Sequence, residues 1–390
     1  MGTLTPTEAL SRCRDLAAQF ALTVDAEDRA GAFASHKAEA MRNAGLCALP
    51  IPRERGGIGA GIQVCSQALE TLAQGDANAA LGMAMHLHVM GGACESGRWS
   101  PIALNALCEA SASPGIFVNA VHSEPEMGSP SRGGLPATTA DPVDGGFLVT
   151  GVKRWATYAP ALDYFIVSAR LATDPGRPEG TGILAVARDS AGLSLQDSWA
   201  DSMSLRCSGS CDVTLRDVFV PEQWLLEIRQ PSPSESTLPP GWASCAFGAV
   251  YLGIAQAALN TIIRYANSRV PTALGKPIAS LAKVQRAIGE IALAVRGARA
   301  LLSEVAGRWD ARPDARQGMA ADVVGAKTAC VNAALEATEG AMRCAGIGGL
   351  ERKLGLERLF RDARAGPLNP PQEDLALELI GRMALSTSES

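Results

Sequence analysis

The sequence predicts an α+β fold that is mostly α-helical, with helices at both ends of the chain and a small β-domain between them. Three observations predict this fold. Apolar residues recur at helical spacing over residues 1–114, short β-branched runs recur about every ten residues over 115–228, and long helical segments fill 229–390. We therefore expect an N-terminal helical domain, a middle β-barrel or sandwich, and a C-terminal bundle of the four-helix type.

The composition is that of an ordinary globular protein. The chain has 390 residues, of which 47% are hydrophobic and 19% charged, so it can bury more than one core. A net charge of −5 argues against a nucleic-acid binder. The first ten residues lack the basic segment and apolar core of a signal peptide, and the apolar stretches are interrupted by polar residues before they could span a bilayer. The ten cysteines form no CxxC pair, so we expect reduced thiols, no metal site and a cytoplasmic protein.

The N-terminal domain is expected to be helical apart from one ordered loop. The loop covers residues 49–59, where prolines and glycines are concentrated. Apolar residues at steps of three and four predict the helices, and Gly45 has the position of a C-terminal glycine. The expected helices are 6–20, 25–45, 61–74 and 77–95.

The middle domain is expected to be antiparallel, with Pro221 closing its last strand. Two of its strands end in small polar residues, one of them beside Trp155. Such strand ends are a plausible flat wall for a planar cofactor. The expected strands are 116–121, 147–152, 164–169, 183–187 and 213–220.

The C-terminal domain follows a Ser- and Pro-rich linker at 230–240. Its segment 277–309 has an apolar residue at every third or fourth position, which predicts a long amphipathic helix. Long antiparallel helices leave apolar surface for a partner subunit, so we expect a homo-oligomer. The other expected helices are 243–267, 319–344 and 373–385.

Four motifs follow one another along the chain: LPIPRERGGIG, SEPEMGS, GVKRWAT and FVP. In this order they resemble motifs of the acyl-CoA dehydrogenase family, and the resemblance covers nearly the whole chain. Residues 49–59 (LPIPRERGGIG) are similar to the family's "iPeeyGGlG" loop. Residues 123–129 (SEPEMGS) resemble its "TEPxxGS" signature, and residues 151–157 (GVKRWAT) resemble "GxKxWIT". Residues 219–221 (FVP) match the strand end before the bundle. The order of helices, β-domain and bundle is also the family's order.

The resemblance implies a flavin site in the β-domain, with FAD as the cofactor. It places the backbone and hydroxyl groups of Val121, His122 and Ser123 at the pyrimidine edge of the flavin ring. Thr157 would hydrogen-bond near N5, and Trp155 would pack against the ring. His122 departs from the family, in which a hydrophobic residue is usual at this position.

The resemblance also implies contacts to the rest of the cofactor and to the substrate. Arg269 and Gln285 lie in a segment similar to "RxxFGxPIxxxQ", although the spacing here is two residues longer and leucine replaces phenylalanine. Gly346 and Gly348 resemble a glycine-rich turn that serves the neighbouring subunit's FAD, which suits a dimer or tetramer. Ser129 matches a serine near the thioester and pantetheine arm of the substrate.

The family's catalytic glutamate is missing. The "RDAR" motif is present at 361–364, but the residue six positions after Arg364 is Pro370. The second place where the family puts its base is the start of the first bundle helix, and residues 241–244 (GWAS) carry no carboxylate. The base of an α-proton abstraction is therefore absent from both expected positions.

Three functions remain open. The first is α,β-oxidation of an acyl thioester, on CoA or a carrier protein, with Glu373 as a relocated base and Asn369 as a substrate-orienting amide. Glu373 can equally serve the final helix by complementing its dipole. The second is a monooxygenase that takes reduced flavin, FMN or FAD, from a reductase, and the third is a flavin-free scaffold. The flavin motifs favour the first, whose reduced flavin would need an electron-transfer partner.

Overall fold

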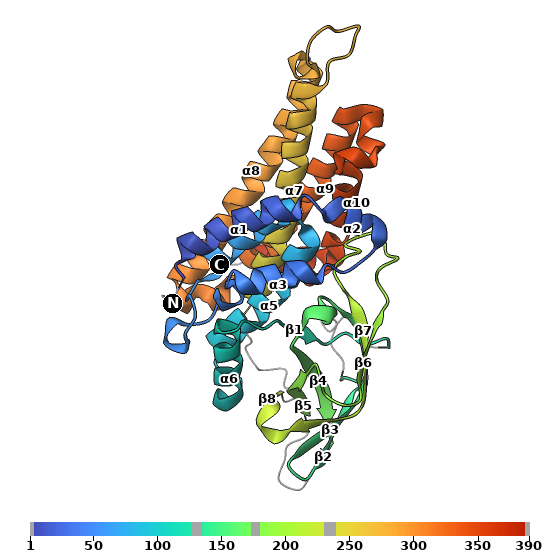
Figure 1. Ribbon diagram of the computed structural model, residues 1–390. Helices are drawn as coiled ribbons and strands as arrows, with labels where there is room; N and C mark the ends of the chain where they lie inside the picture. The colour runs from blue at the N-terminus through green and yellow to red at the C-terminus, as the bar shows by residue number, and fades with distance from the viewer. Residues whose placement is uncertain (1–3, 127–134, 173–179, 230–238, 387–390) are drawn as a thin grey trace.

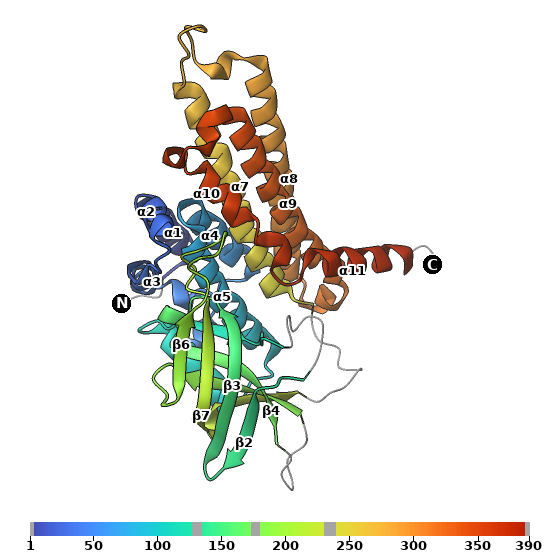
Figure 2. The ribbon, with the colours of Figure 1, turned by 90° about the vertical axis from the view of Figure 1, so that its right-hand side faces the viewer.

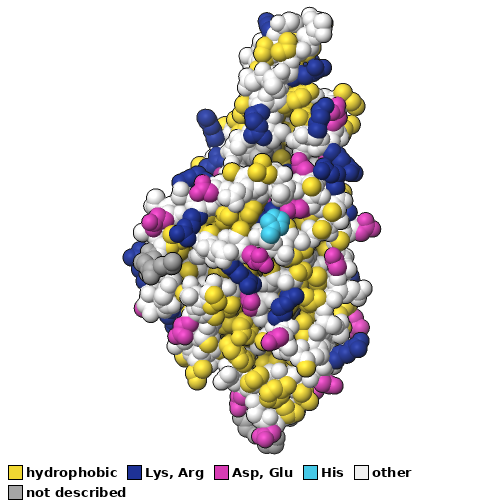
Figure 3. Space-filling model, viewed as in Figure 1, with side chains coloured by type: hydrophobic (Ala, Val, Ile, Leu, Met, Phe, Trp, Pro, Cys, Tyr) yellow, Lys and Arg dark blue, Asp and Glu magenta, His cyan; other side chains and the backbone are white. Residues whose placement is uncertain are grey.

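The computed structural model describes residues 4–126, 135–172, 180–229 and 239–386. The β-domain lies at one end of the molecule, the long bundle helices extend to the other end, and the N-terminal helices lie between them (Figure 1). The mostly helical α+β fold with a C-terminal bundle is confirmed. On the face shown in Figure 3, basic and acidic side chains are interspersed among apolar ones.

The N-terminal domain begins with a capped helix, α1 (Pro6–Phe20). The Thr5 hydroxyl accepts a hydrogen bond from the Glu8 backbone N–H at 3.3 Å, and the Glu8 carboxylate accepts from the Thr5 N–H at 2.8 Å. The single helix expected over 25–45 is wrong, because Gly31 adopts a left-handed φ of 62° that ends the first piece. The domain's other helices are α2 (Val24–Ala30), α3 (Ser35–Asn43), α4 (Ile62–Gly75), α5 (Ala77–Ser96) and α6 (Pro101–Ala112).

The β-domain is one mixed sheet with the strand order β6-β7-β3-β2-β4-β5-β8, and β1 pairs with β4. The purely antiparallel sheet that the sequence predicts is wrong at two places, because β4 runs parallel to both β1 and β2. Long connections separate these strands in the chain, and parallel pairing needs such connections. The strands are β1 (Val118–Val121), β2 (Thr139–Val143), β3 (Gly146–Ala156), β4 (Tyr164–Leu171), β5 (Gly180–Ala187), β6 (Leu193–Asp197), β7 (Cys211–Pro221) and β8 (Leu225–Arg229).

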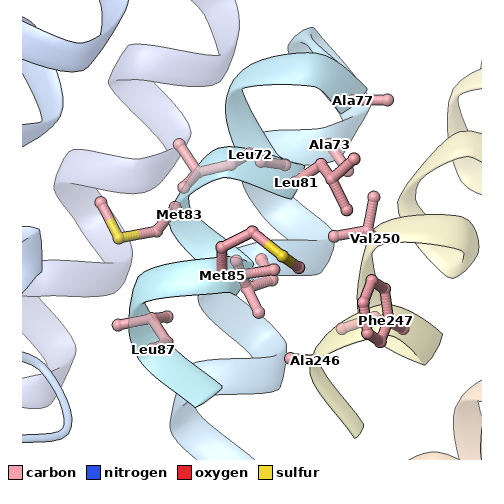
Figure 4. Packing of buried hydrophobic residues seen from close by; sticks show 14 of the residues in the cluster. Leu72, Ala73, Ala77, Leu81, Met83, Met85, Leu87, Ala246, Phe247 and Val250 are labelled. Carbon is pink, nitrogen blue, oxygen red and sulfur yellow. The ribbon is translucent and has the colours of Figure 1, made fainter. Parts of the chain in front are cut away.

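The bundle is organised around α7 (Gly241–Ser268), which packs on α4 and α5 as well as on its bundle neighbours. Figure 4 shows side chains of α5 and α7 meeting in this core, among them Met85 and Phe247. By length and composition α7 could cross a membrane, contrary to the sequence expectation that no stretch could. However, 78% of its apolar window is buried inside the protein, which is typical of a core helix. The other bundle helices are α8 (Ala282–Ala311) and α9 (Ala320–Ala345).

Two shorter helices complete the chain. In α10 (Leu356–Ala363), Arg361 donates to Asp28 at 2.5 Å and so links the bundle to α2. The last helix, α11 (Glu373–Ser386), projects away from the body of the molecule (Figure 2). Its Leu377 and Leu385 side chains are exposed, which leaves apolar surface at the end of the chain. The linker expected at 230–240 lies almost wholly outside the described residues.

Candidate functional site

The two segments predicted to hold a flavin ring lie side by side. The backbone N–H of Arg154 donates to the carbonyl of Ser123 at 2.9 Å. The Asn119 side-chain amide donates to the carbonyl of Thr157 at 3.0 Å. The end of β1 is therefore fixed against the end of β3, and residues 121–123 lie beside residues 155–157. We call these six residues the platform.

A buried ion pair holds the platform together. The Lys153 ammonium donates to the Glu124 carboxylate at 2.5 Å and to the Ser168 carbonyl at 2.6 Å. The same carboxylate accepts from the Ala137 N–H at 2.6 Å and from the Thr138 hydroxyl at 2.6 Å. These hydrogen bonds keep the pKa of the Glu124 carboxyl below its usual range despite burial. Glu124 and Lys153, both from the family-like motifs, thus support the platform from beneath.

Trp155 is the exposed part of the platform. Its side chain is 45% exposed, although tryptophan is usually buried, and its backbone has a left-handed φ of 56°. The irregularity in the β3–β7 pairing between Lys153 and Ala156 produces this conformation. The Thr157 hydroxyl lies 3.1 Å from the Ser210 hydroxyl. A strained backbone conformation at an exposed residue is a feature that binding sites commonly maintain.

A cavity of about 410 Å³ lies where α5, the β-sheet and the start of α7 meet. This volume is within the range of small-molecule sites. His122 belongs both to the platform and to the cavity wall, so the cavity and the platform adjoin at this residue. Its described lining also includes charged and aromatic side chains, namely His88, Glu95, Arg98, Trp99, Glu227, Arg229, Trp242 and Trp309.

The two histidines of the cavity are neutral. Burial lowers the pKa of His122 to about 3 and that of His88 to about 4. The buried Nδ1 of His122 has no hydrogen-bond partner among the described residues. His86, two residues before His88, instead faces the core, where its ring bonds the Cys47 carbonyl at 2.9 Å and the Val118 N–H at 3.3 Å. The cavity therefore offers two uncharged imidazoles, and both are weak bases because burial disfavours their protonated form.

The segment in which the family's base is expected is clamped by a lysine. The buried Lys327 ammonium donates to the carbonyls of Gly366 and Asn369 at 2.8 Å each and to that of Pro371 at 3.0 Å. The Asn369 side-chain amide donates to the Tyr251 hydroxyl at 2.6 Å. Neither Asn369 nor Glu373 is among the described residues that line the cavity, so their catalytic roles stay predictions.

The residues predicted to hold the pyrophosphate lie at the opposite end of the bundle. Arg269 ends α7 with an exposed side chain, and Gly348 lies against Tyr265 one turn earlier on that helix. Gln285 is exposed in the first turn of α8, where its amide donates to the Ala279 carbonyl at 2.9 Å. Trp242 at the cavity precedes Arg269 by 27 residues of α7, or about 40 Å of helix. One dinucleotide does not span this distance within a single chain.

Comparison with known proteins agrees with this geometry. Family models for the N-terminal, middle and C-terminal domains of acyl-CoA dehydrogenase match residues 7–96, 120–218 and 245–368. The putative acyl-CoA dehydrogenase YdbM of Bacillus subtilis is 34% identical over 372 residues, which cover 95% of each chain. This chain belongs to the acyl-CoA dehydrogenase family. It is accordingly a flavin-dependent oxidoreductase.

Solved structures of the family include both dehydrogenases and monooxygenases. The FMN-bound structure of TdsC from Paenibacillus sp. A11-2, a dibenzothiophene monooxygenase, is 26% identical with a TM-score of 0.85, and the match covers 97% of each chain. Butyryl-CoA dehydrogenase from Megasphaera elsdenii has a TM-score of 0.82 over 99% of this chain and 100% of its own. At 21% identity, that second likeness shows the fold alone.

The platform of this family member fits a flavin ring. The unpartnered Nδ1 of His122, the exposed ring of Trp155 and the hydroxyl of Thr157 offer a polar contact, a flat apolar contact and a hydrogen bond in one place. The sequence analysis did not identify His88 and Glu95 as site residues. The His-Leu-His sequence of α5 could have indicated His88, because residues two positions apart face opposite sides of a helix and the two histidines therefore have different surroundings. Ser129 lies outside the described residues.

Proposed function

We propose that this protein catalyses the α,β-oxidation of an acyl thioester carried by CoA or by a carrier protein. The proposal rests on one observation: His122 belongs both to the platform and to the wall of the cavity. An acyl group in the cavity would therefore lie next to the flavin ring. A bound flavin supplies the hydride acceptor for the β-carbon of the substrate.

The proposal assigns the proton transfer to His122. Removal of the α-proton needs a base within hydrogen-bond reach of the α-carbon. His122 is uncharged over the physiological pH range and its side chain belongs to the cavity wall, so it is placed to accept that proton, although burial makes its imidazole a weak base. Glu373, which begins α11, remains the second candidate for the base.

FAD is the proposed cofactor, bound between two copies of the chain. Residues of the platform would hold the ring, while Arg269, Gln285, Gly346 and Gly348 of another copy would hold the pyrophosphate and adenosine. The exposed Ile347 and Leu350 side chains beside these glycines suit burial in such an assembly, a dimer or tetramer. FMN has no pyrophosphate or adenosine, so these four bundle residues would have no part of the cofactor to bind. Reoxidation would require an electron-transfer partner.

The experiment is anaerobic reduction by model thioesters. Purified protein with bound FAD is expected to lose its visible flavin absorbance when an acyl thioester is added. His122→Gln should slow this bleaching by about 100-fold, since general-base catalysis contributes on that order, whereas Glu373→Gln should bleach at the native rate. Fast bleaching by His122→Gln together with slow bleaching by Glu373→Gln would move the base to Glu373. Absence of bleaching with every thioester would overturn the proposed reaction.

The second candidate function is oxygenation with reduced flavin. It is favoured by the neutral histidines of the cavity and by the lack of a carboxylate at residues 241–244 and 370. The likeness to a dibenzothiophene monooxygenase supports the same alternative. A protein of this kind would be purified without flavin and would consume oxygen only when a reductase supplies reduced FMN or FAD. A protein with no affinity for either flavin would instead be a scaffold.

A further inference from the structure

The cavity continues along α5 to a second polar site. His88, Gly92 and Glu95 are spaced by four and three residues, so they share one helix face, and all three line the cavity. Seven residues of helix separate His88 from Glu95, which is about 10 Å. A ligand that begins at the histidines can therefore extend along α5 to Glu95.

Glu95 is held at one oxygen by two indole hydrogen bonds and one ion pair. The indole N–H groups of Trp242 and Trp309 and the guanidinium of Arg316 all lie 3.1 Å from Oε2. Arg316 also donates to the Trp309 carbonyl at 2.9 Å, and its guanidinium lies 5.3 Å from the centre of the Trp309 ring. The carboxylate is therefore fixed in position.

Two glycines make room for the indoles. A Cβ on Gly91 would lie 2.4 Å from the ring of Trp242, and a Cβ on Gly241 would lie 2.6 Å from the ring of Trp309. Neither position could carry a larger side chain without displacing its indole. Gly92 differs, because a Cβ there would meet no atom within 4 Å. The chain thus packs the two tryptophans closely and leaves the wall beside Gly92 open.

The charges at this site favour a neutral hydrogen-bond donor as its ligand. Arg316 already balances the charge of Glu95, and no described residue donates to Oε1. An alkyl group there would remove water from a carboxylate oxygen without replacing the hydrogen bond, which is unfavourable. An ammonium group would leave the pair with an excess positive charge. A hydroxyl or amide N–H satisfies the oxygen and leaves the charge unchanged.

We infer that Glu95 determines substrate specificity by accepting a hydrogen bond from a hydroxyl or amide on the acyl tail, about 10 Å from the histidine end of the cavity. The inference rests on the proposed function, because it takes the acyl group to be the occupant of the cavity. It assigns the substrate class as acyl thioesters with a polar tail, in place of plain fatty acyl chains.

The test compares matched tails. N-acetylcysteamine thioesters of butanoic, hexanoic and octanoic acids, each with and without a terminal hydroxyl, are titrated into the flavin-bound protein by calorimetry. At the length that reaches Glu95, the hydroxylated ligand should bind at least about 10-fold more tightly than the alkyl ligand, since a hydrogen bond to a charged group contributes that much. Equal or tighter binding of the alkyl ligand at every length would overturn the inference.

Variants distinguish a role of Glu95 in recognising the ligand from a role in holding the two tryptophans. Glu95→Gln keeps an oxygen for the indoles and turns an N–H toward the ligand, so the preference should move from a terminal hydroxyl to an acceptor-only methyl ketone. A merely structural role would weaken all ligands equally and leave the ratio unchanged. Gly92→Leu, which fills the open wall, should weaken the longest ligands most. Glu378→Gln, an exposed glutamate of α11, is the matched control and should keep the native ratio.

The two proposals fail in different ways. Bleaching by all thioesters without a preference for the polar tail would reject the role of Glu95 and retain the dehydrogenation. Tight binding of the hydroxylated ligand without bleaching would reject the dehydrogenation and retain the role of Glu95, because the heat then reports binding without flavin reduction.

Discussion

Two buried lysines support the two regions in which this family carries its chemistry, and they do so differently. Lys153 lies beneath the platform, where the Glu124 carboxylate pairs with its charge. Lys327 lies against the segment 366–371, where it donates hydrogen bonds to three backbone carbonyls. Burial lowers the pKa of both, to about 8 for Lys327, and the Glu373 carboxylate opposes that shift. The first region depends on a hydrogen-bonded pair of side chains, whereas the second is held through its backbone carbonyls.

This difference explains how far the sequence could guide the prediction of each region. A pair of interacting side chains fixes the residue type at two positions, so Glu124 and Lys153 stand in recognisable motifs. A lysine that binds carbonyls fixes the residue type only at its own position, because any residue can supply a backbone carbonyl. The segment beside Lys327 can therefore lose its carboxylate and keep its shape. Pro370 stands in the segment that Lys327 holds.

The largest expected effect comes from breaking the pair under the platform. Lys153→Met leaves the buried Glu124 carboxylate without its counter-charge and should lower the free energy of unfolding by about 3–5 kcal/mol. Urea denaturation measures the loss. The double variant with Glu124→Gln should recover part of it, and additive effects of the two changes would show that the pair is not coupled.

The next effect tests Lys327, which donates to three backbone carbonyls. Lys327→Met removes three hydrogen bonds and leaves three carbonyls to find water, so the expected loss is about 2–3 kcal/mol. Hydrogen exchange should become faster across residues 366–371 while the β-sheet keeps its protection. Uniformly faster exchange throughout the protein would mean that the lysine supports the whole bundle instead of this segment.

A pH titration extends the comparison to His122. Its pKa is lowered to about 3 in the folded protein and is about 6.5 when unfolded, so the unfolded state binds more protons between these values. Its neutral burial should therefore cost stability as pH falls below 6.5. Between pH 6.5 and 5 the native protein should lose on the order of 1–2 kcal/mol more than His122→Gln. Equal losses of stability in the two proteins would show that the pKa of His122 is not lowered in the folded state.

The smallest expected effect is at the surface of the platform. Trp155→Gly replaces a residue with a left-handed φ of 56° by the one that adopts this φ without strain. Stability should be unchanged or higher by up to about 1 kcal/mol, while affinity for flavin should fall. Thermal unfolding without flavin and a fluorescence titration with FAD measure the two quantities. A clear loss of stability would mean that the tryptophan serves the fold.

The sequence predicted the fold class and the platform because both leave local patterns. The bounds of α1 agree with the prediction, since its capping residues are adjacent in the chain. Strands such as β2, which contains Pro142, and β6 were missed because they are short and largely polar. The cavity was missed for another reason. His88 and Glu95 share one face of α5 whereas His122 follows β1, and only the packing of α5 against the sheet brings them together.

The length of α7 has a consequence for how the protein retains its cofactor. Its two ends carry the cavity and the predicted pyrophosphate residues, about 40 Å apart. If one FAD takes contacts from both kinds of residue, they belong to different copies, and release of the cofactor is linked to dissociation of the subunits. Dilution alone should then release flavin from the protein. The fraction of protein that retains flavin should depend on the protein concentration as well as on the flavin concentration.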